Sequence, residues 1–382
     1  MDRRDFVRAL GGWTAALLLP DAARAAAWER TLVLVELKGG NDGLNTVVPL
    51  AQDAYYRLRP RIAIARGQVL PLDAQTGLHP ALRPLLDAWA AGELAILRGL
   101  GYPQPRLSHF RSIEIWDSAS RSDQYLEQGW IARALTAQPP PARFAADGIV
   151  IGSADPGPLS GGRARAIVLS DLERFRRQAR FAQPMAGSSN PALAHVMKVE
   201  ADLSRAAARL AEPARALKTG FPRSAFGNAV RTACEALATG FAVPAVRLTL
   251  DGFDTHRNQP ETHARLLAQL AEGLVALRSA LIELGRWEST LVLTYSEFGR
   301  RPRENLSNGT DHGTACAHFA LGPRVRGGLH GTEPSLDRLD ADGNLAHTLD
   351  FRSLYATVLE DWWKMPAGGV LGGRFEKLEL IR

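Results

Sequence analysis

The stretch TLVLVELKGGND, residues 31–42, decides the fold, because an apolar run of strand length ends abruptly in a Gly-Gly-Asn-Asp loop. Such a run, bounded by turn residues, predicts a β-strand over 31–37. Four further segments of this kind are predicted as strands: 94–97, 148–152, 243–250 and 290–294. Helical patterns alternate with these strands. This alternation predicts one three-layer α/β/α sandwich around a mostly parallel, doubly wound sheet.

The clearest helix has five leucines on one face, at spacings of 4, 4, 3 and 4 residues. They are Leu266, Leu270, Leu274, Leu277 and Leu281, and Gly285 ends the pattern. Further helices are predicted over 78–91, over 193–217 with an interruption at Pro213, and over 351–362. Residues 153–192 are rich in Pro, Gly, Ser and Arg. We predict that they form loops or a small cap within a single domain spanning 30–382.

The composition is that of an ordinary globular protein. Of 382 residues, 46% are hydrophobic and 23% are charged, which excludes a disordered or fibrous chain. The net charge of +6 could favour an anionic substrate, but no basic run indicates a nucleic-acid partner. The two cysteines, Cys234 and Cys316, lack CxxC spacing. They exclude a zinc ribbon or a disulfide framework and allow at most one bridge.

The first 25 residues have the pattern of an export signal. The pair Arg3-Arg4 precedes Asp5-Phe6, an uncharged stretch covers 9–20, and Ala-Arg-Ala at 23–25 is a small-x-small cleavage site. The uncharged stretch is shorter than the roughly 17–25 residues of a membrane span. We predict a twin-arginine signal peptide over 1–25, the export machinery as a partner, and a periplasmic or secreted mature protein without a stable membrane span. A retained anchor is the alternative.

Three predicted strands each run into a loop that holds an acidic or histidine side chain. In an α/β sheet, ligands bind beyond the carboxyl ends of the strands, so these groups are expected at one rim. A later polar loop adds an Asp-His pair that has no evident packing role. The mixture of carboxylates and imidazoles predicts a site for one divalent metal ion, or two, with Zn or Mn favoured over Mg or Ca. The predicted ligands are Asp42, Asp254, His256, Glu297, Asp311 and His312.

Most of these residues also have a purely structural interpretation. Asp42 is suited to a turn or to a helix N-cap. Asp254 and His256 could cap the next helix. Glu297 is placed to form an ion pair with one of the arginines at 300–303. The coincidence of three strand ends, rather than any single residue, therefore supports the predicted metal site.

Ser108 is the candidate nucleophile, because it precedes a predicted helix within the segment RLSHFR, residues 106–111. An adjacent metal ion could ionise its hydroxyl, or the residue could serve only as an N-cap. Arg106, Arg111 and Arg300 are candidates for binding an anionic group through their planar guanidinium ends. No Gly-x-Ser-x-Gly turn follows a strand, which disfavours a Ser-His-Asp hydrolase. The remaining histidines are interpreted as mostly structural: His79, His109, His263, His318 and His347.

Taken together, seven short motifs resemble the exported bacterial family called domain of unknown function 1501, which is itself similar to the alkaline phosphatase and sulfatase superfamily. They occur in order along nearly the whole mature chain: residues 37–49, 77–82, 108–110, 129–133, 252–256, 296–300 and 309–313. The resemblance implies an alkaline phosphatase-like fold, in which an Asp follows the first strand, a nucleophile opens a helix and Asp and His ligands come later.

The chain departs from the superfamily pattern in three respects. His256 follows Asp254 by two residues, and Asn258 holds the fourth place of an Asp-x-x-x-His motif. Glu297-Phe298 replaces the Asp-His pair that many members have after a strand, and neither cysteine lies in a Cys-x-Pro-x-Arg motif. Because the predicted acidic and histidine ligands are present, we expect a metal-dependent phosphate- or sulfate-ester hydrolase-like site. Its substrate would be an anionic small-molecule or polymer ester. The alternative is a non-catalytic periplasmic binding or assembly protein with a decayed or structural metal site.

Overall fold

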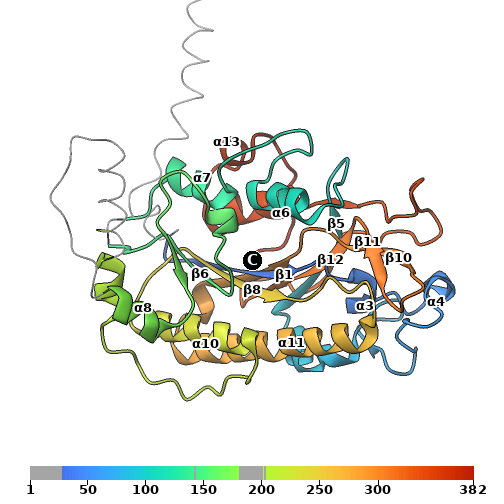
Figure 1. Ribbon diagram of the computed structural model, residues 1–382, viewed down its shortest axis with the longest axis horizontal. Helices are drawn as coiled ribbons and strands as arrows, with labels where there is room; N and C mark the ends of the chain where they lie inside the picture. The colour runs from blue at the N-terminus through green and yellow to red at the C-terminus, as the bar shows by residue number, and fades with distance from the viewer. Residues whose placement is uncertain (1–27, 142, 180–200, 202–203) are drawn as a thin grey trace, which may run out of the picture.

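The computed structural model describes residues 28–141, 143–179, 201 and 204–382. Its central sheet lies between two layers of helices, one on each face (Figure 1). The sheet contains nine described strands, most of which pair in parallel. The predicted α/β/α sandwich is therefore confirmed.

The strands that are far apart in sequence are neighbours in the sheet. Their spatial order is β13 (Gly328–His330), β5 (Leu94–Gly101), β12 (Cys316–Leu321), β9 (Thr290–Tyr295), β1 (Thr31–Lys38), β8 (Ala245–Asp251), β6 (Gly148–Ile151) and β7 (Ala166–Leu169), with β14 (Leu349–Asp350) paired to β5. Among these strands, β12 runs antiparallel to both of its neighbours. Because β1 pairs in parallel with β8 and β9, the carboxyl ends of these three strands lie side by side.

The central strand β1 is buried on both faces. Successive side chains of a strand point to opposite sides, so an uninterrupted apolar run supplies two cores at once. Val33 and Val35 pack in one core, and Leu32 and Leu34 pack in the other. All four are at most 2% exposed. The apolar run at residues 31–37 thus fixes the middle of the sheet.

The helices are divided between the two faces of the sheet (Figure 1). One face is covered by η2 (Pro80–Leu85), α5 (Leu86–Ala90), α8 (Leu172–Ala179), α10 (Ala225–Ala238) and α11 (Gln259–Glu283). The other is covered by α6 (His109–Ser118), α7 (Trp130–Ala137), α12 (Phe351–Thr357), the π turn η5 (Val358–Trp362) and α13 (Gly368–Leu371). The predicted leucine stripe lies in α11, where all five leucines are at most 3% exposed.

Shorter elements surround this framework. They are α3 (Gly43–Thr46), β2 (Val47–Val48), α4 (Asp53–Leu58), β3 (Leu70–Pro71), β4 (Gly77–Leu78), η3 (Gly157–Leu159), η4 (Trp287–Ser289), β10 (Arg300–Glu304) and β11 (Thr310–His312). Of these, β10 and β11 form a separate antiparallel hairpin that contributes to the functional site described below.

The helix predicted over 78–91 is wrong in part. Leu78 belongs to β4, and the segment that follows is the 3₁₀ helix η2 before it becomes α5. Pro84 lies inside η2. Proline lacks a backbone N–H and its ring clashes with the preceding turn, so a continuous α-helix cannot pass through it. The predicted stop at Gly92 agrees with its positive φ of 67°.

The loop or small cap predicted over 153–192 is also corrected over its described part. Residues 166–169 form β7, which pairs in parallel with β6 at the edge of the main sheet, and α8 follows directly. A short strand among many polar residues has too weak a period to be recognised. Of the helix predicted over 193–217, residues 204–210 are helical and the chain after 211 is irregular. The remainder of both segments lies outside the described residues, apart from residue 201, which is helical.

The predicted signal peptide at 1–25 lies outside the described residues. Within the described part of the chain, no helix is both long and apolar enough to cross a membrane. Cys234 and Cys316 are both buried and free, so the one bridge that the sequence allowed is not formed.

Candidate metal centre

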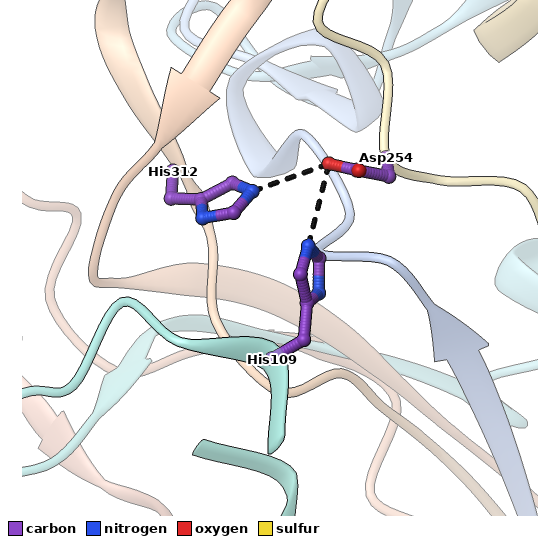
Figure 2. A group of neighbouring side chains, drawn as sticks. All are labelled: His109, Asp254 and His312. Atoms are coloured by element: carbon purple, nitrogen blue, oxygen red, sulfur yellow. Dashed lines mark hydrogen bonds and ion pairs between the residues drawn. The ribbon is translucent and has the colours of Figure 1, made fainter. Parts of the chain in front are cut away.

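Three side chains from separate segments meet beyond the carboxyl end of the sheet (Figure 2). His109 is the first residue of α6, Asp254 lies in the loop after β8, and His312 ends β11. Asp254 Oδ1 is 3.5 Å from His109 Nε2 and 3.2 Å from His312 Nε2. The three ligand atoms lie within 4.8 Å of one another. We refer to His109, Asp254 and His312 as the His/Asp cluster.

His256 adds a fourth group to the same point. Its Nε2 is 3.0 Å from Asp254 Oδ1 and 2.9 Å from His312 Nε2. On its other side, His256 Nδ1 is 3.4 Å from Asp311 Oδ1. The structure therefore brings three of the six predicted ligands, Asp254, His256 and His312, to one point, and Asp311 is one step removed from it.

Two glycines allow the loops of the site to approach this closely. Gly39, at the end of β1, has a φ of +115°, and a Cβ atom there would stand 2.4 Å from the backbone nitrogen of Asp254. Gly309, in the turn of the β10–β11 hairpin, packs on the backbone of His256, where a Cβ atom would stand 2.3 Å from two of its atoms. Real Cβ atoms do not tolerate such contacts, so larger residues would push the loops apart.

The distances from Asp254 Oδ1 to His256 and His312 fit a single metal ion, and the distance to His109 is slightly longer. Two atoms that bind one ion at about 2.0–2.1 Å, with an angle of about 90–110° between the bonds, lie about 2.9–3.4 Å apart. Asp254 Oδ1 is 3.0, 3.2 and 3.5 Å from the three imidazole nitrogens around it. One carboxylate with imidazole nitrogens is also a donor set that suits Zn or Mn.

The rings of His109 and His312 are oriented by their second nitrogens. His109 Nδ1 is 2.8 Å from Glu297 Oε1, and His312 Nδ1 is 2.8 Å from the carbonyl oxygen of Leu107. The hydrogen bond to Glu297 raises the pKa of His109, whereas burial lowers the pKa of His312. If each Nδ1 donates its proton to the neighbouring oxygen, each Nε2 keeps a lone pair that can bind a metal ion next to Asp254, as in metal-binding histidines.

Glu297 lies beneath the cluster and is only 2% exposed. Its Oε1 also accepts a hydrogen bond of 2.9 Å from the Gly39 backbone, and its Oε2 accepts one of 3.1 Å from the Ser296 hydroxyl. Glu297 therefore positions His109, and the described contacts include no ion pair between it and the arginines at 300–303. The sequence predicts Glu297 as a direct metal ligand. In the structure it contacts the ring of His109 instead, and His109 lies between it and Asp254.

Arg300 is placed differently from its predicted role in substrate binding. Its guanidinium is fully buried and donates to backbone carbonyl oxygens of Gly40, Thr310 and Phe253, at 2.7, 3.0 and 3.0 Å. It also donates to Asp254 Oδ1 at 2.7 Å. Burial raises the pKa of Asp254, but the hydrogen bond and charge of Arg300 outweigh this and hold it below its usual range. Arg300 thus anchors the loops and Asp254, and has no free face for a substrate.

Asp42 is separate from the cluster, which corrects its assignment as a ligand. It is 1% exposed, caps α3 through the backbone N–H groups of Leu44 and Asn45, and receives Arg59 Nη1 at 2.6 Å. The side-chain amide of Gln259 donates to its second oxygen as well. These partners satisfy the carboxylate, so the N-cap alternative describes Asp42 correctly.

The segment before α6 holds the candidate nucleophile. Ser108 is the N-cap residue of α6, yet its exposed side chain makes no capping hydrogen bond. Arg106 is exposed, and its guanidinium has no partner among the described residues. Arg111, by contrast, pairs with Glu114 at 2.8 Å and stacks over Tyr125, so it is already engaged. Arg106 is the one of the three predicted arginines that remains available to a ligand.

His109 is the residue that sequence reasoning missed. The sequence alone predicts a structural role for it, because it lacks the acidic or histidine neighbours that mark the strand-end loops. One feature of the sequence could have identified it. His109 directly follows Ser108, the candidate nucleophile, at the predicted start of a helix. Its partner Glu297 lies 188 positions away, so only the fold shows that the two meet.

Comparison with known proteins gives one family and several distant structures. The sequence profile of the family "Protein of unknown function (DUF1501)" matches residues 65–370. The match covers more than half of the chain, and the chain belongs to this family. A search of curated proteins finds no match.

Among solved structures, the similarities are weak. A phosphonate monoester hydrolase of Agrobacterium radiobacter has 10% identity and a TM-score of 0.41, covering 91% of this chain and 78% of that one. The PsFucS1 sulfatase from Pseudoalteromonas sp. has 9% identity and a TM-score of 0.36, covering 94% and 74%. The C-terminal periplasmic domain of EcEptC from Escherichia coli, in complex with Zn, has 11% identity and a TM-score of 0.33. This match covers 77% of this chain and 72% of that one. At these scores the matches support no inference about function.

Proposed function

We propose that this member of the DUF1501 family binds one divalent metal ion at the His/Asp cluster and catalyses the hydrolysis or transfer of a phosphate or sulfate ester. The observation that supports this most strongly is the convergence on Asp254 Oδ1, where imidazole nitrogens of His109, His256 and His312 come within 3.5 Å. We propose Zn or Mn as the ion, because nitrogen ligands favour these metals over Mg and Ca.

The crowding of the imidazoles supports a metal rather than a network of ion pairs. His256 Nε2 and His312 Nε2 are 2.9 Å apart, so the two rings cannot both be protonated there. Arg300 already supplies a positive charge to Asp254 at 2.7 Å. A carboxylate with a buried arginine does not require two or three histidines for charge balance. Their lone pairs are explained by a cation that all of them share.

The chemistry divides between the ion and the chain. A bound divalent ion would supply a Lewis acid that stabilises negative charge on the oxygens of a transferring phosphate or sulfate group. Ser108 would act as the nucleophile. Its hydroxyl makes no capping hydrogen bond, and the residue directly precedes His109 of the cluster. Arg106 would bind the anionic group. Glu297 would fix the ring of His109, and Arg300 would fix Asp254.

A second function is favoured by one observation. Arg300 donates to Asp254 Oδ1, the same atom that faces the three imidazoles. An oxygen with this partner is partly satisfied without a metal, as expected of an exported binding or assembly protein with a decayed or structural site. In either case we propose export by the twin-arginine route to the periplasm or the exterior, with an anionic small-molecule or polymer ester as the ligand of the enzyme.

The test uses the protein without residues 1–25, purified and loaded in turn with Zn, Mn, Mg and Ca. Bound metal is measured by mass spectrometry, and turnover is measured on aryl phosphates, phosphodiesters and aryl sulfates. We expect one ion per chain, turnover of at least one ester class, and loss of turnover in Ser108→Ala with the metal retained. Bound metal without turnover would favour a binding protein with a structural metal, and neither metal nor turnover would favour one with a decayed site. Turnover that does not depend on metal would contradict the proposed mechanism.

A further inference from the structure

The turn of the β10–β11 hairpin, residues 305–309, packs against the loop that holds His256. Three backbone hydrogen bonds of 2.9–3.2 Å join the two segments, from Asn258 to Ser307, from Gln259 to Asn308 and from Thr310 to Thr255. Gly309 also lies directly on the backbone of His256. The turn and the His256 loop are therefore held as one unit, and the place of His256 depends on the turn.

Asn305 begins this turn and uses every hydrogen-bonding position of its side-chain amide. Its Nδ2 donates to the carbonyl oxygen of His256 at 2.9 Å and to Asp311 Oδ1 at 3.2 Å. Its Oδ1 accepts from the backbone N–H groups of Ser307 at 2.9 Å and Gly309 at 3.1 Å. Two donors thus face the oxygen and two acceptors face the nitrogen, which fixes the orientation of the amide. One side chain ties the turn to both the His256 backbone and the Asp311 carboxylate.

His256 is held less closely at its second nitrogen than the other two imidazoles of the site. In His109 and His312, an oxygen lies 2.8 Å from Nδ1. In His256, the nearest such oxygen is Asp311 Oδ1, at 3.4 Å. The Asp311 side chain is 55% exposed, so its surroundings do not enclose it. The hydrogen bond from Asn305 reaches the same Oδ1 and keeps it beside the ring.

We infer that Asn305 is a positioning residue of the metal centre, which acts by holding His256 as a further ligand of the ion. The inference rests on the proposed metal but not on the proposed catalysis. If Nδ1 of His256 carries its proton toward Asp311, Nε2 keeps a lone pair. This Nε2 is 3.0 Å from Asp254 Oδ1 and 2.9 Å from His312 Nε2, so the three atoms can share one ion. Asp311 then serves His256 as Glu297 serves His109.

The test is a double-mutant cycle on Zn affinity, measured by competition with a chromophoric chelator on the protein without residues 1–25. We expect Asn305→Ala to weaken Zn binding by about tenfold, as for loss of a group that orients a metal-binding histidine. His256→Ala keeps the three residues of the His/Asp cluster. In this background Asn305→Ala should have no further effect, because it acts through His256. A role confined to the stability of the turn would give the same loss in both backgrounds.

Two variants separate positioning from the turn itself. Asn305→Ser keeps a hydroxyl that can accept from the turn backbone but is too short to reach Asp311, so it should weaken Zn binding as Asn305→Ala does. It remains informative if Asn305→Ala fails to fold. Asn308→Ala is the matched control. Asn308 is an exposed amide of the same turn with a φ of 56°, and its side chain has no partner within the described chain. Alanine strains the turn there, yet Zn affinity should be unchanged.

Equal losses in the two backgrounds, wild-type Zn affinity in folded Asn305→Ser, or a comparable loss in Asn308→Ala would each overturn the inference. A wild type that binds no Zn would overturn it as well. Ester turnover is measured in the same samples. The expected cycle without turnover would support the inference and count against the proposed catalysis. Metal-dependent turnover together with wild-type Zn affinity in Asn305→Ser would refute the inference alone.

Discussion

Asp42 and Asp254 occupy equivalent places in the sequence and opposite places in the structure. Each follows a parallel strand of the same sheet, and each receives an arginine at 2.6–2.7 Å. The side chain of Asp42 is 1% exposed, whereas that of Asp254 is 48% exposed and faces three imidazoles. The comparison shows that a strand-end carboxylate can hold the fold together or face a ligand. Its solvent exposure and its neighbours decide which.

The largest expected effect is on the stability provided by Asp42. Asp42→Ala leaves the buried Arg59 without its charged partner and removes the cap of α3. Loss of one partner from a buried pair costs about 3–5 kcal/mol of unfolding free energy. Urea unfolding followed by circular dichroism measures this. A variant with wild-type stability that has lost its metal would restore Asp42 to the ligand set.

The next effect concerns the orientation of His109. Glu297→Gln keeps the shape of the side chain but weakens its hold on His109 Nδ1. Replacement of such a carboxylate partner lowers metal affinity by about 10–100-fold. Competition with a chromophoric chelator gives the dissociation constant for Zn. An unchanged affinity for Zn in a folded variant would show that Glu297 holds the Gly39 backbone in place but does not orient His109 for the metal.

How far the sequence predicts this molecule differs between its parts. The strand β1 and the leucine stripe of α11 are predicted because burial on two faces, or on one helical face, leaves a regular apolar pattern. Asp42 and Asp254 cannot be distinguished in this way, because Arg59 and Arg300 come from other segments. The same holds for His109, whose partner Glu297 is remote in sequence. Predictions fail where the deciding contact is long-range.

A smaller effect is expected in the pH dependence of stability. Burial raises the pKa of Asp42, but the charge of Arg59 outweighs burial and keeps it below its usual range. A carboxyl group with a depressed folded pKa stabilises the protein fully above its unfolded pKa, about 3.9, and the stabilisation is lost as the pH falls through the folded value. The stability gap between wild type and Asp42→Asn should therefore be constant from pH 7 to 5 and shrink below pH 4. Urea unfolding at each pH measures it, and a gap that widens in acid would contradict the assignment.

The most direct test of the central claim compares the two aspartates by metal content. Wild type, Asp254→Asn and Asp42→Asn are purified without residues 1–25, dialysed against Zn and measured by mass spectrometry, with folding checked by circular dichroism. We predict one ion per chain in the wild type, loss of the ion in folded Asp254→Asn, and retention of the ion by folded Asp42→Asn. Loss of the ion in Asp42→Asn with retention in Asp254→Asn would contradict the account.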